Sequence, residues 1–193
     1  MAFSAEELRN ILRESFNDAA HEFYGIYDFE QALREPNVNV VDALLTFIVQ
    51  KIERSDLFQW RIVDRLTNVL ISQSHQQELT EEQAERFLSL IEKGQNIFYD
   101  DDKLYQVINC LDTQKYTAVL MKFVEKLVRE KQRQDWCWIA YAVIGRSLGN
   151  RFQFPRELVG ELVIEALKEK DPHRRNQMIF LSGRLAENQK LYT

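Results

Sequence analysis

The sequence has few of the residues that turn a chain sharply, cross-link it or bind metals. Its 193 residues include 6 glycines and 3 prolines, which supply little turn chemistry, so we expect long helices joined by short links. The 2 cysteines, Cys110 and Cys137, stand apart in apolar surroundings and favour buried free thiols over a disulfide. No apolar run approaches the roughly 20 residues of a membrane-spanning helix, and the acidic, amphipathic start is unlike a secretory signal. The sequence therefore predicts a soluble cytoplasmic protein that engages no membrane.

Motifs of catalysis and cofactor binding are also missing. Glycine-rich phosphate loops, Gly-x-Ser-x-Gly and Cys-x-x-Cys do not occur. Asp18 and His21 form half of a helix-borne metal site, but no second half exists among the 3 histidines. The run Asp100-Asp101-Asp102 fits a helix start better than a cation site, and Cys137 fits core packing better than a nucleophile. We predict no catalytic residue, no cofactor and no metal, and we favour a role other than that of an enzyme.

The charge of the chain is acidic overall and unevenly distributed. The net charge is −5, from 25 basic and 30 acidic side chains. Residues 1–50 contain 3 basic and 9 acidic residues, whereas residues 151–193 contain 8 basic and 6 acidic residues. Overall acidity argues against broad binding to a phosphate backbone, but it is compatible with a local basic surface near the C-terminus.

Apolar residues recur at helical spacing along most of the chain. No segment alternates apolar and polar residues for more than a few positions, so the predicted fold class is all-α. Thr80 and Gln83 form a capping box that opens a helix ending at Gly94, and the polar stretch 72–79 predicts a loop. The expected helices cover 4–24, 40–54, 55–72, 80–93, a short segment after the three aspartates, 113–131, 134–148 and two within 155–188.

The stretch from Pro155 to Asn188 predicts two amphipathic helices joined by a tight turn. Pro155 suits a first helical turn, and Asp171-Pro172 ends the first helix. Gly183 is expected to leave room for a neighbouring backbone. The expected buried residues are Leu158, Leu162, Val163, Ala166 and Leu167 in the first helix and Met178, Leu181 and Leu185 in the second.

This stretch resembles a HEAT repeat: a proline-led first helix, an Asp-Pro turn, an arginine early in the second helix and a Gly-x-Leu ending. The resemblance implies a single domain, 1–193, of stacked antiparallel helical hairpins in a HEAT-like α-α superhelix. The N-terminal helix 4–24 would cap this stack. A compact helical bundle is the alternative architecture. The hairpins would cover about 40–72, 80–112, 113–149 and 155–188.

The resemblance implies a function in recognition. We expect a non-catalytic protein–protein recognition module, such as an adaptor, scaffold, inhibitor or assembly factor, whose partner is another protein. The alternative is a HEAT-like nucleic-acid-binding or DNA-processing protein that uses a local basic C-terminal surface. Aromatic residues anchor many protein interfaces. The candidate partner-binding residues are Trp136, Phe152, Phe154, Arg174 and Arg175, of which Phe152 and Phe154 are expected to be the most exposed of the aromatic residues.

Overall fold

The computed structural model describes residues 6, 10, 38–52, 57–94, 101–111, 114–132, 134–146 and 154–190, and the described part of the chain is all-α, without a strand. The predicted helix 4–24, apart from residues 6 and 10, and the position of Phe152 lie outside the described residues. The chain divides into two compact units, residues 1–100 and 101–193. The single domain stays a prediction, and so does the hairpin at 80–112, which spans the boundary between the units.

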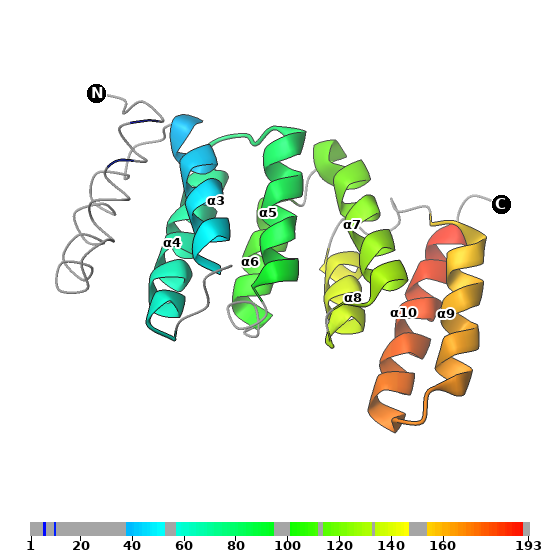
Figure 1. Cartoon of the computed structure of the whole chain (residues 1–193). Helices are drawn as coiled ribbons and strands as arrows, with labels where there is room; N and C mark the ends of the chain where they lie inside the picture. The colour runs from blue at the N-terminus through cyan, green and yellow to red at the C-terminus, as the bar shows by residue number, and fades with distance from the viewer. Residues whose placement is uncertain are drawn as a thin grey trace. The chain divides into compact units, whose positions relative to one another are not determined.

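The first unit contains three described helices, α3 (Val38–Ile52), α4 (Leu57–Gln76) and α5 (Glu81–Lys93). α3 packs against both α4 and α5 (Figure 1). Large side chains that are fully removed from solvent fill the space between the helices. Because their burial removes apolar surface from water, these residues hold the unit together. They include Leu44, Leu45, Ile48, Leu66, Leu70 and Phe87.

The end of α4 differs from the prediction of a loop at 72–79, because the helix continues to Gln76. Two polar residues of its last turns are buried, Gln73 at 1% exposure and Ser74 at 7%. The Ser74 hydroxyl donates to the carbonyl of Leu70, one turn back, at 2.7 Å. A serine that satisfies its hydroxyl within the helix is tolerated there, so polar composition alone misplaced the helix end.

The start of α5 confirms the predicted capping box. The backbone N–H of Gln83 donates to Thr80 Oγ1 at 3.1 Å, and the backbone N–H of Thr80 donates to Gln83 Oε1 at 3.0 Å. Gly94 ends the helix as predicted, with its N–H donating to the carbonyl of Leu90 at 2.7 Å. These caps satisfy backbone groups that a helix end leaves without partners.

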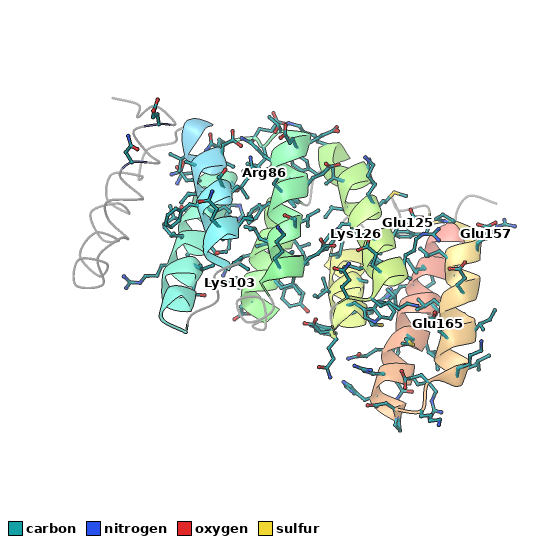
Figure 2. The ribbon with its side chains drawn as sticks, in the orientation of Figure 1. Arg86, Lys103, Glu125, Lys126, Glu157 and Glu165 are labelled. Atoms are coloured by element: carbon teal, nitrogen blue, oxygen red, sulfur yellow. The ribbon has the colours of Figure 1, made fainter. Side chains whose placement is uncertain are left out.

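Arg86 links α5 to α3 (Figure 2). Its Nη1 donates to Asp42 Oδ1 at 2.9 Å, and its Nη2 donates to Thr46 Oγ1 at 2.8 Å. Asp42 and Thr46 are one turn apart on α3, so both ends of the guanidinium are held. The contact fixes how α5 lies along α3.

The second unit contains α6 (Asp101–Cys110), α7 (Thr117–Glu130), α8 (Trp136–Arg146), α9 (Arg156–Lys168) and α10 (Pro172–Lys190). A short 3₁₀ turn, η1 (Gln114–Tyr116), precedes α7. α8 packs against α6, α7 and α10, and α9 packs against α10 and α7 (Figure 1). Thus α6, α8 and α10 form one layer of this unit, and α7 and α9 form the other.

The two central helices of the second unit match the sequence pattern. The predicted apolar face of α7 is buried throughout. α8 is apolar on nearly every side because helices surround it: most of its residues are buried, and Trp138 and Tyr141 are half-buried. Burial on several sides explains its lack of a polar face. The buried residues of α7 are Val119, Leu120, Phe123, Val124, Leu127 and Val128.

The last two helices show where the predicted burial was wrong. In α9, Val163 is 42% exposed and Leu167 is 77% exposed, because α10 and α7 cover the side that carries Leu158 and Leu162. In α10, the predicted burial of Met178, Leu181 and Leu185 is confirmed. Outside its own helix, no heavy atom of the residues that the structure describes lies within 4 Å of a Cβ built on Gly183, so no described neighbouring backbone approaches it.

Candidate functional site

The structure separates the residues that the sequence grouped as partner-binding. Trp136 is 6% exposed and Phe154 is 5% exposed, so the expectation that Phe154 is open to solvent is wrong. Its ring directly precedes α9 and is covered by the unit, as large aromatic rings usually are. Arg174 and Arg175 are exposed in the first turn of α10.

Trp136 and Arg174 nevertheless line one open cavity of about 640 Å³ in the second unit. This polar cavity lies where α7 and α9 end and where α8 and α10 begin. Two helix ends of each polarity meet there, so their dipoles largely offset one another and the side chains set the local charge. The lining residues are Lys131, Gln134, Trp136, Cys137, Glu165, Lys168, Glu169, Lys170, Arg174, Gln177 and Met178.

The lining of the polar cavity is cationic although the chain is acidic. Four basic side chains and two carboxylates line it. One carboxylate, Glu165, is ion-paired with Lys131, and the other, Glu169, accepts the backbone N–H of Asp171 at 3.0 Å. Lys168, Lys170 and Arg174 form no ion pair with any residue that the structure describes. The cavity therefore presents an excess of positive charge to solvent.

Lys131 connects three helices at the wall of the polar cavity. It ends α7 in a left-handed conformation, φ 48°, with its N–H donating to the carbonyl of Leu127 at 3.1 Å. Its ammonium reaches Glu165 on α9, a residue labelled in Figure 2, and lies 5.8 Å from the ring centroid of Trp136 on α8. A cation over an indole face is attracted by the ring quadrupole. Lys131 therefore fixes the wall of the cavity that α8 and α9 share.

Asp171 fixes the start of the helix that carries Arg174. Its Oδ1 accepts the backbone N–H groups of His173 at 2.8 Å and Arg174 at 3.3 Å. These hydrogen bonds, followed by the nearby charges of Arg174 and His173, lower the pKa of the Asp171 carboxyl. The carboxylate caps α10 and holds its first turn at the edge of the polar cavity.

A smaller apolar cavity adjoins the polar one. It has a volume of about 210 Å³ and is lined by Trp138 and Tyr141 of α8 and by Gln177 and Phe180 of α10. The rings of Trp138 and Tyr141 are stacked, with centroids 5.8 Å apart, and Phe180 is 68% exposed. Gln177 lines both cavities, so the two adjoin along α10 and together offer one candidate surface. We call this surface the joined cavities.

Among the residues that the structure describes, Cys137 is the one thiol that lines the joined cavities. It lines the polar cavity, but burial raises the pKa of its thiol to about 12, so the thiol stays protonated near neutral pH and is a poor nucleophile. Cys110 and Cys137 are both buried and are not joined by a disulfide, as predicted. Within the described ranges, no group of three or more potential metal ligands comes together, and no helix has the length and apolar character to cross a bilayer.

A second exposed apolar surface lies on α9 and is separate from the joined cavities. Val163, Ile164 and Leu167 are 42%, 53% and 77% exposed there, and none of them lines either cavity. This surface offers control positions that match Phe180 in exposure and apolar character.

Phe180 is the site residue that sequence reasoning missed. Helical spacing assigns Met178, Leu181 and Leu185 to the buried face of α10, which leaves Phe180 on the opposite side. A large aromatic residue off the core face is the signal that would have identified it. Trp138 and Tyr141 carried no comparable signal, because α8 is apolar on nearly every side.

Comparison with known proteins gives no relative: no family model matches the chain, and no curated protein and no solved structure is significantly similar to it.

Proposed function

We propose that the protein is a non-catalytic recognition module that binds another protein through the joined cavities of α8 and α10. The observation that carries this proposal is the exposed ring of Phe180 beside Trp138 and Tyr141. Aromatic residues that enter or line a pocket supply most of the binding energy at protein interfaces. A partner side chain that fills the apolar cavity would cover all three rings at once.

The exposed area of Phe180 is large enough to matter for binding. A phenylalanine side chain buries roughly 150–250 Å², so 68% exposure leaves roughly 100–170 Å² to be covered. At about 25 cal/mol per Å², covering that area contributes at most about 3–4 kcal/mol. Ordering of the interface reduces this value, but the remainder fits an interface hot spot of about 2 kcal/mol.

Nucleic acid binding is the second candidate, favoured by the cationic side chains of Lys168, Lys170 and Arg174 at the polar cavity. The excess over the carboxylates of that lining is two charges, and the chain carries a net charge of −5. A protein that makes about 6–10 contacts to DNA phosphates needs more cationic side chains than the polar cavity presents. We therefore rank protein recognition first, because it also uses the exposed aromatic residues of the apolar cavity.

Affinity capture with three variants tests the proposed function. The tagged wild-type chain, Phe180→Ala and Leu167→Ala are compared in nuclease-treated lysate of the source organism. We expect one protein to be retained by the wild type and by Leu167→Ala, whose altered side chain is 77% exposed outside the joined cavities, and to be lost with Phe180→Ala. Equal retention by Phe180→Ala would contradict the proposal, and recovery that nuclease abolishes would support nucleic acid binding instead.

A further inference from the structure

We infer, as a step that rests on the proposed function, that the joined cavities recognise an acidic segment of the partner protein. In this arrangement one or two carboxylates enter the polar cavity beside Lys168, Lys170 and Arg174. An apolar side chain of the same segment fills the apolar cavity against Phe180. The joined cavities would thus recognise a carboxylate and an apolar side chain at a fixed separation.

The preference for carboxylates follows from which charges in the cavity are already paired. Glu165 is held by Lys131, and Glu169 accepts a backbone N–H, so neither forms an ion pair with the remaining cations. The Asp171 carboxylate at the edge of the cavity interacts with the charge of Arg174 and offsets one positive charge, which leaves an excess of one. An incoming carboxylate would gain charge-assisted hydrogen bonds from these cations, and a guanidinium such as that of Arg174 can hold it with two parallel bonds. An incoming lysine or arginine would meet like charge, so the same cavity disfavours basic segments.

The spacing of the two features follows from the geometry of α10. Arg174, Gln177 and Phe180 follow one another at intervals of three residues on this helix, and Gln177 belongs to both cavities. At 1.5 Å per residue, Arg174 and Phe180 are separated by about 9 Å along the helix axis. An extended segment covers about 9 Å in three residues, whereas a helical one needs about six. The carboxylate and the apolar side chain are therefore expected about three positions apart in an extended partner.

A random 12-residue peptide display library, selected in parallel on four forms of the full chain, tests this inference. The forms are the wild type, the charge reversal Lys170→Glu/Arg174→Glu, Phe180→Ser and the control Leu167→Ala. We expect the wild type and Leu167→Ala to enrich Asp or Glu about three positions from Leu, Ile, Phe or Trp. The charge reversal should enrich Lys or Arg at the acidic position, and Phe180→Ser should lose the apolar preference.

The outcomes separate failure of the inference from failure of the proposed function. Peptides that depend on Phe180 but show no acidic preference would overturn the inference and leave protein recognition standing. Peptides that bind all four forms equally, or no enrichment on the wild type, would overturn both. Circular dichroism of each form checks folding, which these exposed positions should not disturb.

Affinity of a selected peptide gives the quantitative form of the same test. Replacing its carboxylate by the matching amide is expected to weaken binding to the wild type roughly tenfold or more, because a hydrogen bond to a charged group is lost. The same replacement should leave the affinity for Lys170→Glu/Arg174→Glu unchanged or improve it. Equal loss with both forms would place the carboxylate elsewhere and contradict the inference.

Discussion

Replacing Phe180 by alanine should leave the stability of the protein nearly intact, although the residue is large and apolar. The neighbouring position, Leu181, is fully buried and provides the comparison on the same turn of α10. Truncating a buried phenylalanine costs about 3–5 kcal/mol, and truncating a buried leucine costs about 2–5 kcal/mol. Because Phe180 is 68% exposed, about one third of its surface contributes, which gives roughly 1–1.7 kcal/mol. The better helix propensity of alanine offsets about 0.5 kcal/mol of this, so the expected cost is about 1 kcal/mol.

Equilibrium unfolding in urea measures this difference. Circular dichroism is the appropriate signal for both variants, because Phe180 adjoins Trp138 and its removal changes tryptophan emission directly. We expect Leu181→Ala to lower the free energy of unfolding by at least about 1 kcal/mol more than Phe180→Ala, with an unchanged dependence on urea. A Phe180→Ala variant as unstable as Leu181→Ala would show that the ring belongs to the core, and the apolar cavity would lose its role as a docking surface.

Three further predictions concern the fold around the site and in the first unit. Gly183→Ala should raise the free energy of unfolding, measured in urea titrations, by roughly 0.5–1 kcal/mol. The reason is that a Cβ added at this position of α10 meets no described atom outside its own helix within 4 Å. A loss of stability would mean that another group packs against this position. A double-mutant cycle of Arg86→Ala and Asp42→Ala should give a coupling of about 0.5–1 kcal/mol that weakens with salt, and zero coupling would contradict the 2.9 Å contact. Burial raises the pKa of Cys137 from 9.0 to about 12, so the folded thiol keeps its proton where the unfolded one loses it. This contribution to stability is present below pH 9 and falls as pH rises toward 12. Native Cys137 should accordingly resist a thiol reagent at neutral pH, and rapid labelling of the folded chain would refute its burial.

Local signals in the sequence were sufficient to predict several helices. The capping box of Thr80 and Gln83 marks the start of α5 because it satisfies two backbone donors within four residues. The apolar spacing of α7 marks a buried face because one side of that helix meets neighbours. Neither signal depends on distant parts of the chain, which is why sequence alone was enough.

The candidate site depends on packing that the sequence does not encode locally. Lys131 and Glu165 are 34 residues apart and meet only because α7, α8 and α9 pack together. Helical spacing gives Leu167 an apolar pattern but does not say which neighbours cover it, and none of the described helices buries it. For the same reason the sequence predicts Phe154 at the surface and does not single out Phe180.

The three tryptophans allow the central claim to be tested in one measurement. Trp136 lines the polar cavity and Trp138 lines the apolar cavity, whereas Trp60 belongs to α4 of the first unit. The indole N–H signals of ¹⁵N-labelled protein are assigned with single Trp→Phe variants and followed as the captured partner, or a selected acidic peptide, is added. Binding at the joined cavities predicts that the signals of Trp136 and Trp138 shift together with saturation. Saturable binding that moves Trp60 alone, or that moves none of the three, would contradict the account.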